Sequence, residues 1–116
     1  MDSLEELRQR IAAFAAERDW DQFHSPKNLS MALIAEAAEL VEHFQWLSEE
    51  QSSSLGDKKL QEVGEELADI LIYLVRVADR LGIDLIQAAD RKIAINAERY
   101  PVERVRGDAR RACEYD

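Results

Sequence analysis

Residues 33–40 read LIAEAAEL, an apolar helical run in which Glu36 and Glu39 stand three positions apart. One predicted helix later, Glu66 and Asp69 repeat this spacing inside a second apolar run. Residues i and i+3 share one face of a helix, so each pair directs both carboxylates the same way. Because apolar residues flank both pairs, we expect all four acids to face the interior of a helical bundle.

Four carboxylates on one bundle interior need protons, cationic partners or a bound metal, because unpaired buried charge is strongly unfavourable. A metal ion is the simplest joint solution. An all-oxygen ligand set favours Mg²⁺, with Mn²⁺ as a substitute, over Zn²⁺. A di-iron carboxylate bundle would instead need Glu-x-x-His pairs, and the residue three before His43 is Leu40. His43 itself is interpreted as a surface hydrogen-bonding group.

The composition predicts one domain, residues 1–116, with 47% hydrophobic residues and a formal net charge of −9. That charge disfavours nucleic-acid polymers and anionic membranes as partners, but a nucleotide can still enter together with Mg²⁺. The sequence has no long uncharged apolar run and no basic segment at its acidic start, so we expect a cytoplasmic protein without a membrane span. Its single cysteine, Cys113, allows no intrachain disulfide.

The periodicity predicts an all-α fold in which four helices form a bundle. Capping signals set the starts of the helices: Ser3 precedes the first, Ser25-Pro26 the second and Asp84 the fourth. The segment 19–25 is expected to be a loop and 48–56 a polar, mobile connection, and the tail is weakly patterned. The expected helices and tail run over about 3–18, 26–47, 57–81, 84–100 and 102–116.

The order and spacing of these motifs resemble the MazG-like all-α nucleoside triphosphate pyrophosphohydrolases, and within them most closely the dCTP pyrophosphatase branch. The resemblance spans about residues 4–107, and the ending Cys113-Glu114-Tyr115 is similar too. The motifs that support it are Arg18-Asp19-Trp20-Asp21-Gln22-Phe23-His24, Glu36-x-x-Glu39, Glu66-x-x-Asp69, Lys92-x-x-x-Asn96-x-x-Arg99-Tyr100-Pro101 and Arg106-Gly107.

The resemblance implies a hydrolase of phosphoric anhydrides that cleaves a nucleoside triphosphate between the α and β phosphates. dCTP or a modified dCTP is the favoured substrate, in nucleotide-pool house-cleaning. Glu36, Glu39, Glu66 and Asp69 correspond to the family's Mg²⁺ ligands and catalytic carboxylates. The resemblance also implies a MazG fold assembled as a homodimer or as a dimer of dimers.

Further residues match positions where the family contacts its substrate. An aromatic ring can stack on any base, and a lysine one turn from an asparagine can offer a cation and an amide on one face. Plain packing remains the alternative for the tryptophans, and a solvated helix face the alternative for the lysine and asparagine. The expected substrate-binding residues are Trp20, His24, Trp46, Tyr73, Lys92 and Asn96.

Two other interpretations remain open. All-α dUTP hydrolases share the acidic helical scheme, so the base could be uracil. A non-catalytic helical interaction module could also use acidic pairs in assembly.

Overall fold

The computed structural model describes residues 1–114, which form helices and connecting turns without a strand. The prediction of an all-α chain is confirmed. Two compact units are distinguished, Met1–Ile83 and a second unit that starts at Asp84. No helix within residues 1–114 combines the length and the apolar character that crossing a bilayer requires. Tyr115, which belongs to the C-terminal similarity, lies outside the described residues.

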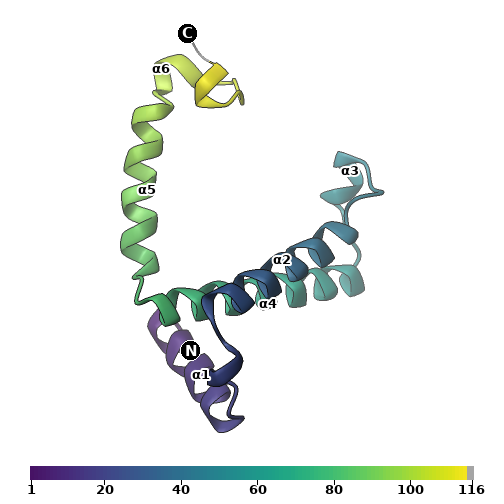
Figure 1. Cartoon of the computed structure of the whole chain (residues 1–116). Coiled ribbons are helices and arrows are strands. Elements are labelled where there is room, and N and C mark those ends of the chain that lie inside the picture. The colour runs from purple at the N-terminus through teal and green to yellow at the C-terminus, as the bar shows by residue number, and fades with distance from the viewer. Residues whose placement is uncertain (115–116) are drawn as a thin grey trace. The chain divides into compact units, whose positions relative to one another are not determined.

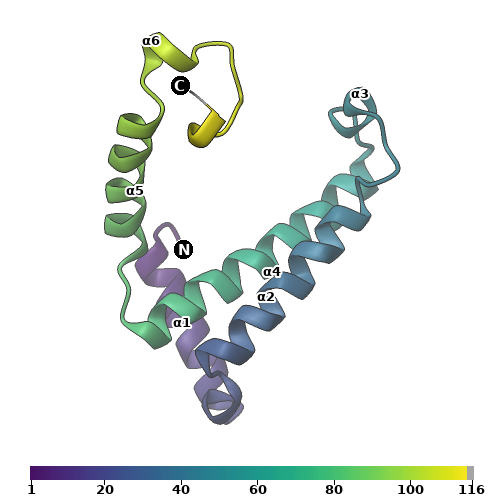
Figure 2. The same ribbon diagram turned by 45° about the horizontal axis from the view of Figure 1, so that its top comes forward.

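Three long helices build the first unit: α1 (Leu4–Glu17), α2 (Pro26–Glu42) and α4 (Asp57–Leu81). α2 and α4 run antiparallel and side by side along most of their length, as both views of the ribbon show (Figures 1 and 2). α1 packs against α4. The acidic pairs are therefore on two neighbouring helices.

Local sequence signals explain where these helices begin and end. The hydroxyl oxygens of Ser3 and Ser25 accept hydrogen bonds from the backbone N–H groups of Glu6 and Asn28, each at 3.1 Å. α4 ends at Leu81 and is followed by Gly82, whose φ of 68° is a left-handed conformation that glycine adopts without steric cost. The predicted starts of these helices are confirmed to within a residue or two.

The connection between α2 and α4 differs from the prediction. α2 ends at Glu42, and residues 43–46 continue as tight turns, where a helix as far as residue 47 was expected. The predicted polar connection contains the one-turn helix α3 (Glu49–Ser52). Ser48 and Gln51 form a reciprocal capping box there, because the side chain of each accepts the other's backbone N–H.

The first unit buries few side chains for its length. Within residues 1–114 the buried hydrophobic residues are small or medium-sized, and only Leu29 is a large side chain with as little as 2% exposure. Many large apolar side chains of α2 and α4 remain exposed instead. The buried hydrophobic set is Ala15, Leu29, Val63, Val75 and Ala78.

The second unit is built on α5 (Leu85–Arg99), which Asp84 caps by accepting the backbone N–H of Gln87 at 3.0 Å. The weakly patterned tail contains two short elements, α6 (Val102–Val105) and the 3₁₀ turn η2 (Ala112–Glu114). The hydroxyl of Tyr100 accepts the backbone N–H of Ala112 at 2.9 Å and so connects the tail to the end of α5.

Candidate metal centre

Three of the four predicted carboxylates converge between α2 and α4. Glu36 and Glu39 of α2 and Glu66 of α4 each offer a carboxylate oxygen, and these oxygens lie within 4.8 Å of one another. The i, i+3 spacing brings the two α2 acids to one face, and the antiparallel neighbour places Glu66 opposite them. Such a cluster of hard oxygen donors suits Mg²⁺ or Mn²⁺.

Burial makes this cluster unfavourable without a cation. Oε2 of Glu36 and Oε2 of Glu66 are buried and have no hydrogen-bond partner among residues 1–114. Burial, followed by the nearby carboxylates of Glu39 and Glu66, raises the pKa of Glu36 to about 7. Burial also raises the pKa of Glu66. Unpartnered buried oxygens beside like charges are the condition that a divalent ion relieves, so the donor set fits one.

Asp69 stands apart from the other three acids. Its side chain is exposed, and it is not in the cluster of oxygens that lie within 4.8 Å. Its charge nevertheless contributes to raising the pKa values of Glu36 and Glu66. The second acidic pair therefore divides: Glu66 faces α2 closely, whereas Asp69 acts on the cluster through its electric field.

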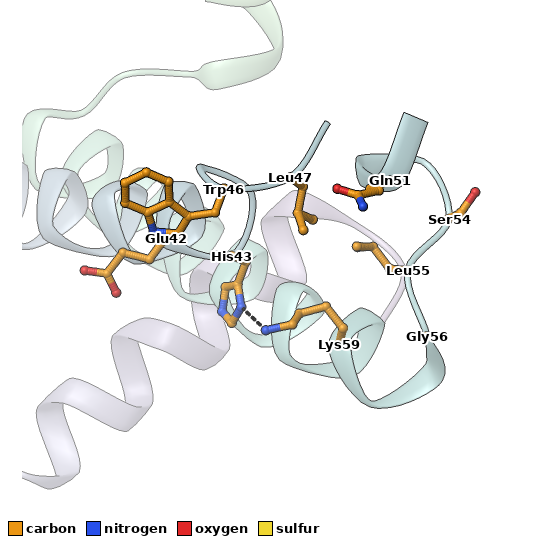
Figure 3. A pocket seen from close by; sticks show the side chains of 9 residues that line it. All are labelled: Glu42, His43, Trp46, Leu47, Gln51, Ser54, Leu55, Gly56 and Lys59. Atoms are coloured by element: carbon orange, nitrogen blue, oxygen red, sulfur yellow. Dashed lines mark hydrogen bonds between the residues drawn. The ribbon is translucent and has the colours of Figure 1, made fainter. Parts of the chain in front are cut away.

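A cavity of about 400 Å³ opens where α2 gives way to α3. Trp46 lines one side and is 87% exposed, and His43 and Lys59 lie together below it in the view (Figure 3). The Lys59 Nζ atom is 3.2 Å from Nδ1 of His43. The full lining is Glu42, His43, Trp46, Leu47, Gln51, Ser54, Leu55, Gly56 and Lys59.

His43 connects this cavity to the acidic cluster, a role that the sequence did not reveal. Its side chain is 17% exposed, which is more buried than the predicted surface position. Its Nε2 atom is 4.0 Å from a carboxylate oxygen of Glu66, and its Nδ1 atom is 3.9 Å from one of Glu62. The four-residue separation of Glu39 and His43 was the available signal, because it places both on one side of α2.

The other predicted substrate-binding residues of the first unit lie on two elements. Trp20 and His24 flank the short 3₁₀ turn η1 (Asp21–Phe23), and their rings meet edge to face with centroids 6.3 Å apart. Trp20 also packs edge to face on Phe14 of α1, with ring centroids 5.7 Å apart, and the residue is 43% exposed. Tyr73 is half-buried on α4, one turn beyond Asp69.

Lys92 and Asn96 lie on α5 in the second unit. Both side chains are exposed, and their four-residue separation puts them on one face of the helix. Their contact with a substrate stays a prediction.

Comparison with known proteins places this architecture among pyrophosphatases. Residues 32–111 match the MazG-like family. The chain is 47% identical to dCTP pyrophosphatase 1 of Mus musculus over 115 residues, which cover 97% of this chain and 66% of that protein. It is 44% identical to dCTP pyrophosphatase 1 of Homo sapiens over 114 residues, covering 97% of this chain and 67% of the human protein. The chain thus spans about two thirds of the length of these relatives.

A solved structure shows the same fold. The crystal structure of a pyrophosphatase from Archaeoglobus fulgidus superposes with a TM-score of 0.80 at 40% sequence identity, covering 84% of this chain and 91% of that one. The two proteins are therefore similar both in the arrangement of their helices and in sequence.

The raised pKa of Glu36 predicts how pH affects the metal-free protein. The folded state holds a proton on Glu36 up to about pH 7, whereas the ordinary pKa is 4.5, so folded protein binds more protons between these values. The free energy of unfolding contributed by this group therefore falls as pH rises from about 4.5 to about 7. We expect the melting temperature of metal-free protein to drop by a few degrees over that range, and millimolar Mg²⁺ to restore it at pH 7.5.

Glu36→Gln is the control, because it removes this titration while keeping the side chain's shape. Thermal melts of both proteins between pH 5 and pH 8 show how much of the pH dependence requires the Glu36 carboxyl, including its interaction with Glu66. The same pH dependence in both proteins would contradict the assignment.

Proposed function

Because this chain belongs to the MazG-like family, we propose that it is a Mg²⁺-dependent nucleoside triphosphate pyrophosphohydrolase. It cleaves a deoxynucleoside triphosphate between the α and β phosphates and releases the monophosphate and pyrophosphate. dCTP or a modified dCTP is the favoured substrate, because the relatives at 44–47% identity are dCTP pyrophosphatases. The observation that supports the proposal most is the cluster of Glu36, Glu39 and Glu66 with its two unpartnered buried oxygens.

The proposed roles of the four carboxylates are metal binding and activation of the attacking water. Glu36, Glu39 and Glu66 would hold the ion, and Asp69 is proposed as a fourth ligand because of its place in the family motif. When bound, Mg²⁺ supplies positive charge that offsets the charge developing on the phosphoryl oxygens. A carboxylate oxygen left outside the metal's shell orients the attacking water or takes its proton. Glu36 has to release its proton before it can serve as a ligand, so we expect metal affinity to increase up to about pH 7.

The cavity beside the cluster is the proposed base site. Its volume of about 400 Å³ lies within the range of small-molecule pockets, and Trp46 offers an aromatic face on its wall. His43 lies between this cavity and Glu66, so a nucleotide whose base stacks on Trp46 would extend its phosphates toward the carboxylates. Trp20, His24, Tyr73, Lys92 and Asn96 are proposed as the further contacts.

The exposed apolar stripes support assembly into a homo-oligomer, a homodimer or a dimer of dimers. On α4, Leu67, Leu71 and Leu74 are 40–51% exposed and recur at i, i+4 and i+7, which is one helix face. On α2, Ile34 and Val41 are 66% and 56% exposed and lie seven residues apart. Apolar surface of this extent on a chain with few buried side chains is typical of subunits that complete their core by association.

Turnover tests the proposed function. We expect Mg²⁺-dependent release of pyrophosphate from a panel of canonical and modified deoxynucleoside triphosphates, concentrated on the cytosine compounds and abolished by excess EDTA. Glu39→Gln should lower kcat roughly a hundredfold or more, because it removes one charged ligand from the metal site. Glu65→Gln is the matched control, because Glu65 is exposed and outside the cluster.

The panel also decides among the alternatives. Release from dUTP alone would keep the reaction and change the base. If no nucleotide is cleaved while the chain stays helical and oligomeric, the interaction module becomes the better account.

Trp46→Ala tests the base site. Trp46 is 87% exposed, so we expect little change in melting temperature, together with an increase in KM of about tenfold from the lost stacking. Trp46→Phe keeps an aromatic face, so its KM should lie between those of the wild type and Trp46→Ala. An unchanged KM with a lowered melting temperature would instead assign Trp46 to packing.

Leu71→Glu tests the assembly surface. A carboxylate on the exposed apolar stripe of α4 should dissociate the oligomer to monomers, as measured by light scattering of the eluting protein. Gln61→Glu adds the same charge to an exposed position on another face of α4 and should leave the mass unchanged. Equal masses for both variants would place the interface elsewhere.

A further inference from the structure

Arg76 is the only charged residue among the described residues 1–114 that is buried, with 4% exposure. Each of its three guanidinium nitrogens has a different partner. Nε donates to Nδ1 of His24 at 3.0 Å, Nη2 to a carboxylate oxygen of Asp21 at 2.6 Å, and Nη1 to one of Asp79 at 3.4 Å. A side chain near the C-terminal end of α4 thus holds the segment that contains Trp20 and His24.

The contact with Arg76 determines where His24 holds its proton. A guanidinium stays protonated and only donates, so Nδ1 of His24 has to accept. In a neutral imidazole the proton is then on Nε2. Burial, and then the charge of Arg76, lowers the pKa of His24, so the ring is neutral near pH 7. The charge of Asp21 raises the pKa of His24 and that of Arg80 lowers it, and both effects are smaller than those of burial and Arg76.

The Nε2 atom of His24 is not among the fully buried, unpartnered side-chain atoms of the described residues, although the ring is only partly exposed. Nε2 makes no hydrogen bond to another residue in the described part of the chain. The backbone of His24 is also fixed, because Nε of Arg80 donates to its carbonyl oxygen at 3.2 Å. Trp20 lies edge to face beside the ring. His24 therefore offers one neutral N–H donor of fixed direction, next to an aromatic ring.

We propose that Arg76 is a positioning residue that holds His24 in the Nε2–H tautomer, so that His24 donates a hydrogen bond to an acceptor oxygen of the bound nucleotide. This rests on the proposed function, because the nucleotide is the ligand. A neutral donor suits this task, because it can pair with an oxygen acceptor without adding a charge that changes with pH.

The surrounding charges indicate that the network would tolerate loss of Arg76. Asp79 keeps a second cation, because Nη1 of Arg8 donates to it at 3.1 Å. Asp21 is 49% exposed, so water can solvate its carboxylate. Arg76→Met keeps most of the buried volume of the side chain and leaves no fully buried carboxylate without a partner. The variant is expected to fold.

The tautomer is measured directly by nitrogen NMR of the full chain with ¹⁵N-labelled histidine, without nucleotide. We expect an unprotonated Nδ1 and a protonated Nε2 for His24, and in Arg76→Met a mixture of both tautomers. The chain's other histidine, His43, does not contact Arg76 and serves as the internal reference. A protonated Nδ1 in the wild type, or an unchanged tautomer in Arg76→Met, overturns the proposal.

Kinetics separate positioning from a purely structural role. We expect Arg76→Met to raise KM about tenfold, the effect of one lost hydrogen bond to a charged acceptor, and to change kcat less. His24→Ala should raise KM by a similar factor, and the double variant should be no worse than His24→Ala alone. Arg76→Lys, which can still donate to Nδ1, should recover part of the loss.

Additive effects in the double variant would show that Arg76 acts independently of His24 and would overturn the proposal. Because the NMR measurement needs no nucleotide, its failure is distinct from a failure of the proposed hydrolysis.

Discussion

The mutual repulsion of Glu36, Glu39 and Glu66 is the constraint on which the proposed chemistry depends. Their oxygens lie within 4.8 Å of one another in a partly buried position, which is unfavourable for three anions. The packing of α2 against α4 holds the three acids together. A proton on Glu36 relieves part of their repulsion. A divalent ion would relieve more of it, so the proposed metal binding depends on a cluster that is unfavourable without a cation.

The same helix pair leaves large apolar side chains exposed to solvent. α2 and α4 bury few large side chains, whereas a stripe of leucines on α4 is exposed. The acids lie between the two helices, and the exposed apolar stripes are the surfaces proposed for association. Burial by a second copy would also lower the polarity around the cluster and strengthen its attraction for a cation.

Sequence patterns predicted the helices and the cluster because both depend on local spacing. The i, i+3 acids and the caps at Ser3, Ser25 and Gly82 act within one or two turns. The departure of Asp69 from the cluster depends on how far each position on α4 lies from α2, which spacing on one helix does not encode. The role of Arg76 was not predicted, because its partners His24 and Asp21 are 52 and 55 residues away.

The central claim is that these carboxylates hold a divalent ion, and anomalous diffraction from crystals grown with Mn²⁺ tests it most directly. The account predicts an anomalous peak within ligand distance of Glu36, Glu39 and Glu66, absent from crystals of Glu39→Gln. A peak elsewhere on the chain, or an equal peak in the variant, would contradict it.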